Sequence, residues 1–217
     1  DKGFGVVSVV FLLLLLSLLA TRHPAHAQLP AFLCALFRLP GPVESRRAEG
    51  DDGSGIRMGM AVGANAVHLE MGSISLPIHP PKSVSKGILV NRTGQRFINE
   101  DVYMGLLGEH VLFRQDGVSY LIFDDATFTR PALDRTLLGV GETPAELAAE
   151  IGVPAAALEA TIALYNQGAL RGEDPLFHKH ADYLVPLQKP PFGAFDCRTA
   201  ESPFAAFTLG GLETDAN

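Results

Sequence analysis

The chain has 217 residues, 47% of them hydrophobic, which is enough to bury the core of one ordinary domain. Its formal net charge of -7 at pH 7 argues against the basic surface that nucleic acids attract, so we expect no nucleic-acid partner. Cys34 and Cys197 have no CxxC spacing and no histidine pair nearby, which argues against a zinc site and favours two free thiols over a disulfide.

Residues 1–28 have the pattern of a secretory signal peptide. Lys2 precedes an apolar run over 6–20, and Ala25 and Ala27 follow at the spacing of a cleavage signal. The run is shorter than the roughly 20 residues that a membrane span needs. Two alternatives stay open, an uncleaved membrane anchor and a leader joined to the rest by a faulty gene model. We expect a secreted or membrane-anchored protein if the segment is genuine, and a cytoplasmic one otherwise.

Residues 29–54 predict a linker of uncertain structure, because glycine, proline and charged residues dominate its second half. After it the pattern becomes that of mixed helices and strands. Small residues over 56–66 predict a helix with Gly59 and Gly63 on one face, where another backbone can approach closely. Residues 67–72 predict a short strand.

A loop, a hairpin and a helix are expected next. Three prolines exclude a helix from residues 76–81. Residues 87–90 and 95–99 flank the turn 91–94, which ends in glycine, and this predicts a hairpin. Residues 101–114 predict a helix whose apolar positions include Val102, Leu106 and Val111.

The second half begins with a strand and a well-delimited helix. Residues 118–125 are β-branched, aromatic and apolar, which predicts a buried strand. Thr143 is a helix cap, Pro144 opens the helix, and Glu146 stands at the spacing of a capping box. This helix should end near Gly152.

One more helix and two strands complete the prediction. Pro154 opens a helix that continues to about Gly168, and its apolar residues have helical spacing and should lie in the core. These core residues are Leu158, Ile162 and Tyr165. Residues 192–197 and 204–212 predict strands.

The segment GILVNRTGQRFINED at 87–101 resembles the capping domain of FAD-dependent fumarate reductases, succinate dehydrogenases and 3-ketosteroid Δ1-dehydrogenases. Members of this superfamily commonly show G-hydrophobic-V-N-x-x-G-x-R-F-x-N-E. The helix pair at 142–177, including its Y-N and G-x-D-x-x-F, is similar to theirs, and so are GIRMGMAVGA with HLEMG, PPFGAF at 190–195 and TLGGLETD at 208–215. The resemblance covers residues 55–217.

The resemblance implies an α+β fold class. Residues 55–217 would form a flavoprotein capping domain of small sheets with helices, with edges of the FAD-binding domain, preceded by an apolar N-terminal helix. It also implies FAD as cofactor. The glycine-rich G-x-G-x-x-G turn that holds the FAD pyrophosphate is not found in the sequence, since no strand precedes GDDGSG at 50–55. We therefore expect a fragment that binds FAD weakly when alone.

The resemblance places the candidate catalytic residues around one turn. Fumarate reductases have a proton-donating arginine four residues after the glutamate of R-F-x-N-E, where this chain has Met104. Tyr103, beside it, is the alternative acid or base, in the neighbourhood where ketosteroid dehydrogenases use a tyrosine. The same residue can instead simply pack at the start of a helix. Arg96 and Glu100 are expected to form a charge pair that orients the turn, or else an ordinary surface ion pair.

Candidate binding residues follow from the same resemblance. Thr208, Gly210 and Gly211 lie in the segment that passes near the flavin, where glycines let a backbone approach a planar ring, or form an ordinary turn. Phe207 replaces a histidine of fumarate reductases, which favours a larger, apolar substrate. His79 lies near the position of their substrate-binding histidine, although a solvated loop histidine is the favoured interpretation.

Two hypotheses of different class remain. The first is a fragment of an FAD-dependent dehydrogenase or reductase that acts on a CH–CH unit of a small apolar, steroid-like substrate, and is more similar to ketosteroid dehydrogenases than to fumarate reductases. The second is a non-catalytic capping or binding domain, secreted or membrane-anchored. His178 and His180 have no partner at metal-ligand spacing, so we expect no metal site.

Overall fold

The computed structural model describes residues 53–215 except 70, 80, 134 and 203, with the backbone alone at 206–208. The predicted signal segment 1–28 and most of the predicted linker lie outside the described residues. The chain divides into two units, and their described parts are 53–73 with 207–215, and 74–206. Within the described residues, no helix is long and apolar enough to cross a membrane.

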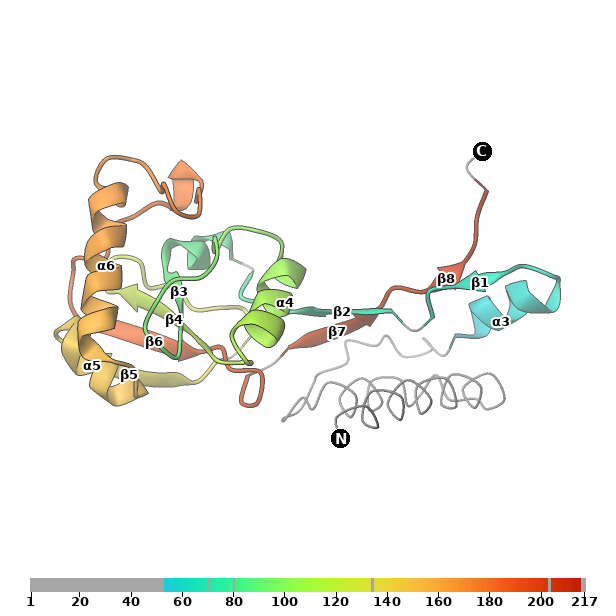
Figure 1. The fold of residues 1–217 in the computed structure, drawn as a ribbon, viewed down its shortest axis with the longest axis horizontal. Coiled ribbons are helices and arrows are strands. Elements are labelled where there is room, and N and C mark those ends of the chain that lie inside the picture. Colours follow the sequence, from blue (N-terminus) through green and yellow to red (C-terminus); the bar gives the residue numbers. More distant parts are fainter. Residues whose placement is uncertain (1–52, 70, 80, 134, 203, 216–217) are drawn as a thin grey trace, which may run out of the picture. The chain divides into compact units, whose positions relative to one another are not determined.

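A four-stranded antiparallel sheet is the centre of the unit formed by residues 74–206 (Figure 1). Its strands are β3 (Ile88–Asn91), β4 (Ser119–Asp124), β5 (Leu137–Gly141) and β6 (Phe192–Asp196), in the order β3-β4-β6-β5. All six residues of β4 are buried, as expected for a central strand covered on both faces.

Alternate side chains of the sheet enter two separate cores. On one face, Ile88 and Ile122 pack with apolar residues of the helices α5 (Pro144–Ile151) and α6 (Ala155–Ala169). On the other face, Leu89 and Leu121 pack with the helix α4 (Met104–Arg114) and with the apolar residues that follow the strand β2 (Gly72–Ser75). The short 3-10 helices Lys82–Lys86 and Ala181–Tyr183 lie in the connecting loops.

The unit formed by 53–73 and 207–215 is small. It contains the helix α3 (Ser54–Ala61) and an antiparallel pair of two-residue strands, β1 (Ala66–Val67) and β8 (Gly211–Leu212). The strand β7 (Ala205–Thr208) pairs with β2, and the chain passes from one unit to the other along these two strands.

Most predicted elements of 74–206 are present with nearly the predicted bounds. The hydroxyl of Thr143 accepts the backbone NH of Glu146 at 3.2 Å, and Gly152 ends α5 with a left-handed backbone. The apolar positions predicted for α6 are buried. In α4, Leu107 is fully buried, whereas its neighbour Leu106, one of the apolar positions named from the sequence, is 41% exposed.

Three local predictions were wrong. The strand predicted at 67–72 is interrupted after Val67, since His68 has φ 57° and its carbonyl accepts the NH of Met71. Residues 95–99 are not a strand, because only Arg96 bridges β3 before the chain leaves the sheet edge. Gly63 lies beyond the end of α3, so it shares no helix face with Gly59.

Candidate functional site

The segment that carries the sequence resemblance is anchored by a buried cluster of four charged side chains, which we call the ionic cluster. It consists of Arg96, Glu100, Asp174 and Lys179, whose side chains are at most 5% exposed. Arg96 Nη2 lies 2.8 Å from Glu100 Oε2 and 3.0 Å from Asp174 Oδ2. With all four groups ionised, two positive charges balance two negative ones.

Glu100 joins three parts of the chain. Its Oε2 lies 2.8 Å from Lys179 Nζ, and its Oε1 accepts the backbone NH of Leu89 in β3 at 2.9 Å. The same ammonium donates to the carbonyl of Gly87 at 2.7 Å. The expected pair between Arg96 and Glu100 is thus present, and the alternative of a surface ion pair is wrong because both side chains are buried.

Two aromatic rings complete the surroundings of the cluster. The guanidinium carbon of Arg96 lies 4.9 Å from the ring centroid of Tyr165 in α6 and 4.9 Å from that of Phe177. The ammonium of Lys179 lies 5.0 Å from the Tyr165 centroid. At these distances the ring faces attract the two cations and replace part of their lost hydration.

The cluster sets the protonation of its members. Burial alone raises the pKa of Glu100, but the charges of Lys179 and Arg96 outweigh burial and lower the pKa. Burial lowers the pKa of Lys179, and the Glu100 carboxylate offsets this only in part. Burial likewise disfavours the Arg96 cation, yet Glu100 and Asp174 raise its pKa. Both carboxylates are therefore ionised at neutral pH.

Tyr103 lies three residues beyond Glu100, at the residue before α4 begins. It is 72% exposed, and no described residue hydrogen-bonds to its hydroxyl. The interpretation that Tyr103 packs at the start of the helix is therefore wrong. Its side chain is available to a molecule that approaches the surface of this unit.

His79 is buried, which contradicts the favoured interpretation of a solvated loop histidine. It is 8% exposed, and its Nε2 lies 3.4 Å from the hydroxyl of Ser85, which in turn donates to the carbonyl of Glu100 at 3.2 Å. Burial, with the nearby charge of Lys82, lowers the pKa of His79 to about 4. His79 is thus neutral at physiological pH and packs behind the turn that carries Glu100.

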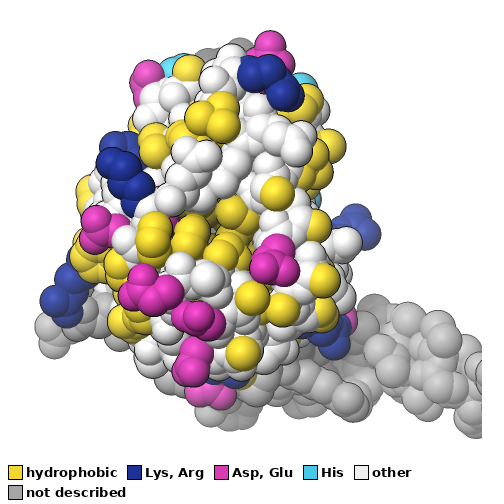
Figure 2. All heavy atoms as spheres, turned by 90° about the vertical axis from the view of Figure 1, so that its left-hand side faces the viewer, with side chains coloured by type: hydrophobic (Ala, Val, Ile, Leu, Met, Phe, Trp, Pro, Cys, Tyr) yellow, Lys and Arg dark blue, Asp and Glu magenta, His cyan; other side chains and the backbone are white. Residues whose placement is uncertain are grey.

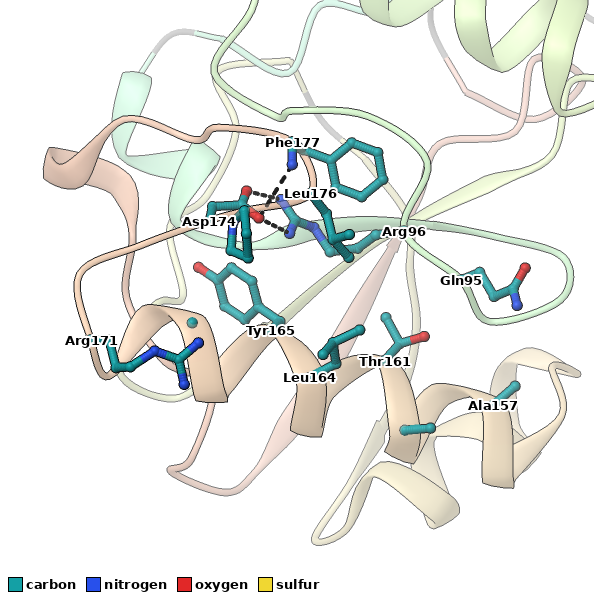
Figure 3. A pocket seen from close by; sticks show the side chains of 13 residues that line it. Gln95, Arg96, Ala157, Thr161, Leu164, Tyr165, Arg171, Asp174, Leu176 and Phe177 are labelled. Atoms are coloured by element: carbon teal, nitrogen blue, oxygen red, sulfur yellow. Dashed lines mark hydrogen bonds and ion pairs between the residues drawn. The ribbon is translucent and has the colours of Figure 1, made fainter.

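A groove of about 370 Å³ lies beside the ionic cluster, along α6 (Figure 3). Leu164, Leu176 and Phe177 line it, and Arg96 and Asp174 lie at its inner wall. Figure 2 shows apolar side chains in the middle of the face that carries α5 and α6, with acidic and basic side chains around them. None of the candidate residues predicted from the sequence except Arg96 lines this groove.

The candidate cofactor residues Thr208, Gly210 and Gly211 lie in the other unit, and so does the candidate substrate residue Phe207. Phe207 and Thr208 are in β7, where the backbone alone is described. A Cβ added to Gly210 would lie 2.4 Å from the carbonyl oxygen of His68, so close backbone contact within this unit explains that glycine. A Cβ added to Gly211 would meet no atom within 4 Å. The face of Gly211 is therefore open.

The junction of β5 and α5 is a strand that ends in Gly141, a short turn and a helix, the order of elements that can hold a pyrophosphate. Here the helix start is already occupied, since the Glu146 carboxylate accepts the NH of Glu142 and Thr143 caps the first turn. The two glutamates would also repel an anion. The start of α5 therefore does not fit the pyrophosphate of FAD.

Two members of the ionic cluster were missed by sequence reasoning. Asp174 lies in the G-x-D-x-x-F segment that carries part of the resemblance, so a signal for it was present. Lys179 stands between His178 and His180, which attracted attention as possible metal ligands. Among the described residues, no group of three His, Cys, Asp or Glu side chains could hold a metal ion. Cys197 is a buried free thiol.

The chain is similar in sequence to known flavin-dependent proteins. Residues 17–217 match the family model described as "FAD binding domain". The chain is 34% identical over 185 residues to NADH:acrylate oxidoreductase of Vibrio harveyi, a match that covers 75% of this chain and 18% of that protein. It is 32% identical over 191 residues to 3-oxo-5-alpha-steroid 4-dehydrogenase of Comamonas testosteroni, covering 77% of this chain and 36% of the relative.

The fold is also similar to that of a solved structure. The 3-ketosteroid-delta4-(5alpha)-dehydrogenase of Rhodococcus jostii RHA1, in complex with 4-androstene-3,17-dione, superimposes with a TM-score of 0.62 at 37% identity. The match covers 77% of this chain and 35% of that one. The chain thus spans between 18% and 36% of the lengths of these relatives.

Proposed function

The chain belongs to the FAD binding domain family of FAD-dependent oxidoreductases, and on this basis we propose that residues 55–217 are the capping domain of such an enzyme, with edges of its flavin domain. The proposed reaction moves two hydrogens to or from a CH–CH unit of a small apolar substrate. When bound, FAD accepts or returns one of them as a hydride with its two electrons. The protein handles the other as a proton.

Tyr103 is the proposed proton-handling residue. The main support for this proposal is that its side chain is exposed and can reach a bound substrate. The side chain is 72% exposed on a turn that the buried ionic cluster holds in place. In the oxidising direction the phenolate form of Tyr103 takes the proton from the carbon next to the one that loses the hydride and becomes the phenol, and in the reducing direction the phenol returns that proton and becomes the phenolate. Glu100 and Arg96 shape the turn and do not themselves reach the substrate.

An apolar, steroid-like substrate is favoured over a dicarboxylate. Met104 stands where fumarate reductases have a proton-donating arginine, and Phe207 stands where they have a histidine. Two of the similar proteins are named for steroid substrates, and one was solved with 4-androstene-3,17-dione. The proposed flavin contacts are Gly211, whose face is open, and the neighbouring Thr208 and Gly210. His79 is proposed to act on the substrate side by packing, through Ser85, against the turn that carries Glu100.

The test is Tyr103→Phe in the flavin-loaded protein that contains this chain. Loss of the hydroxyl should lower turnover of a 3-ketosteroid roughly 10²-fold, because the ring stays in place while the proton acceptor is removed. Steady-state turnover with an artificial electron acceptor measures the effect. Tyr183→Phe, which removes a hydroxyl elsewhere on the same unit, is the control. Unchanged turnover in Tyr103→Phe would exclude this residue from the chemistry.

A further inference from the structure

The segment 174–180 contacts the turn before α4 at several points, and the ionic cluster is the innermost of them. Arg96 faces Asp174 with two parallel hydrogen bonds, Nη1 to Oδ1 at 3.1 Å and Nη2 to Oδ2 at 3.0 Å. Asp174 also accepts the backbone NH of Lys179 at 3.2 Å. This two-point geometry fixes orientation as well as distance.

A second set of contacts lies closer to Tyr103. The backbone NH of His180 donates to Asp101 Oδ2 at 2.6 Å, and the amide of Asn99 donates to the carbonyl of His178 at 3.2 Å. From the other side, Lys82 Nζ donates to the carbonyl of Asp101 at 2.9 Å. Asp101 is therefore held on both its side chain and its backbone, two residues before Tyr103.

The chain is held again immediately after Tyr103. The carbonyl of Met104 accepts the backbone NH of Leu76 at 3.0 Å, and the carbonyl of Tyr103 accepts the NH of Leu107 in the first turn of α4. Tyr103 thus combines a backbone fixed on both sides with a side chain that is 72% exposed. A side chain that is exposed but carried on a rigid backbone can be presented to a bound molecule in one position.

The burial of four charges calls for a reason other than stability. Removing charged groups from water is so unfavourable that buried ion pairs are often no more stabilising than apolar side chains of the same volume. Their benefit is that they permit one arrangement of the groups they join. In this chain the joined groups are β3, the turn that leads to α4, and the segment 174–180.

We propose that Asp174 and Asp101 are positioning residues, which hold the turn between β3 and α4 so that the Tyr103 hydroxyl meets the substrate at a fixed place. This inference rests on the proposed function of Tyr103. It assigns the segment 174–180 a part in catalysis although none of its side chains reaches the reacting atoms. Asp174 acts through Arg96, and Asp101 acts by accepting the NH of His180.

The first experiment concerns the geometry alone and uses the chain without flavin. Asp174→Asn weakens the pair with Arg96, and Asp101→Ala removes the acceptor of the His180 NH. Each should increase the hydrogen–deuterium exchange of the backbone amides of 96–104 at least tenfold, while amides of the central strand β4 exchange as before. Asp125→Asn, an exposed aspartate, is the control. Unchanged exchange at 96–104 in both variants would overturn the inference.

The second experiment tests the link to Tyr103 by a double-mutant cycle in the flavin-loaded protein. Asp101→Ala should lower kcat about tenfold with little change in KM, and Asp101→Asn, whose amide oxygen still accepts the NH, should restore most of it. In a Tyr103→Phe background the same Asp101→Ala change should have no further effect on kcat. If the tenfold loss persists in that background, Asp101 does not act through Tyr103.

The two proposals fail in different ways. If Tyr103→Phe leaves kcat unchanged, the proposed function of Tyr103 is wrong, and with it the catalytic part of this inference. If Tyr103→Phe lowers kcat but Asp101→Ala and Asp174→Asn leave both kcat and amide exchange unchanged, only the positioning role is wrong. Asp101 is partly exposed, so its variants test the inference even if Asp174→Asn fails to fold.

Discussion

The buried imidazole of His79 illustrates how a single side chain can couple folding to pH. Its pKa falls from 6.5 to about 4 in the folded chain, because burial and the charge of Lys82 disfavour the protonated form. Between these two values the unfolded chain binds a proton that the folded chain does not. Stability is therefore complete above pH 6.5 and decreases as the pH falls toward 4.

We expect this titration to be visible in the free energy of unfolding. Between pH 7 and pH 5 the wild type should lose roughly 2 kcal/mol more than His79→Gln, which cannot titrate in this range. Urea unfolding followed by circular dichroism at the two pH values measures the difference. His110→Gln, on the surface of α4, controls for loss of an imidazole. Equal losses in wild type and His79→Gln would show that His79 is not buried in neutral form.

The ionic cluster is a second feature that depends on individual side chains. Arg96 and Glu100 are four apart in the sequence and lie in one motif, and their pairing was expected from the sequence. Asp174 and Lys179 reach the same place from 78 or 79 residues further along the chain, as the hydrogen bond between Arg96 and Asp174 illustrates at a separation of 78. The spacing of residues along the chain does not predict contacts between side chains that are so far apart in the sequence.

At the scale of elements, α4 shows how a short sequence feature permits close packing. Gly108 faces the end of β2 and the residue after it, where an added Cβ would lie 2.4 Å from the carbonyl oxygen of Ile74 and 2.8 Å from the NH nitrogen of Leu76. No Cβ atom can occupy that position without a shift of backbone. The glycine therefore lets α4 approach the strand and bury Leu107 and Val111.

Gly108→Ala should consequently destabilise the chain by roughly 1–3 kcal/mol, although alanine is the better helix former. Thermal unfolding followed by circular dichroism measures the loss. Gly55→Ala in α3 is the matched control, because its added Cβ would meet no atom within 4 Å, and its stability should be unchanged or slightly higher. A neutral Gly108→Ala would contradict the close approach of α4.

At the scale of the whole molecule, membership of an FAD-dependent family does not by itself predict that this chain binds FAD tightly. The family is FAD-dependent, yet the sequence contains no G-x-G-x-x-G turn that follows a strand, and the start of α5 is capped by its own side chains. The match to relatives also covers no more than 36% of the lengths of the curated proteins described above. Flavin affinity of the 217-residue chain should therefore depend little on the adenine dinucleotide part.

We expect the chain to bind FAD weakly, and no more tightly than riboflavin. The physical reason is that FAD gains affinity over riboflavin chiefly where backbone NH groups at a helix start hold its phosphates. Parallel titrations of the two flavins, followed by fluorescence quenching, measure the ratio of their dissociation constants. One-to-one FAD binding that is far tighter than riboflavin binding would require a phosphate site in this chain.

The sequence by itself determined what depends on neighbours along the chain. The capping box at Thr143, the stop at Gly152, the helical spacing of Leu158, Ile162 and Tyr165, and the buried strand β4 were all predicted with nearly the observed bounds. These signals are local because a helix cap or an apolar period involves residues only a few positions apart. The motif at 87–101 likewise identified the family.

Only the tertiary structure decided which of these residues meet. It buried His79, for which a solvated loop histidine had been the favoured interpretation, and it left Tyr103 exposed at the start of α4. It also brought Asp174 to Arg96 and Lys179 to Glu100. Burial is a property of the packed unit, because the solvent around a side chain is removed by segments that are distant in the sequence. For the same reason, the pKa values and the rigidity of the proposed site depend on the fold rather than on its motif.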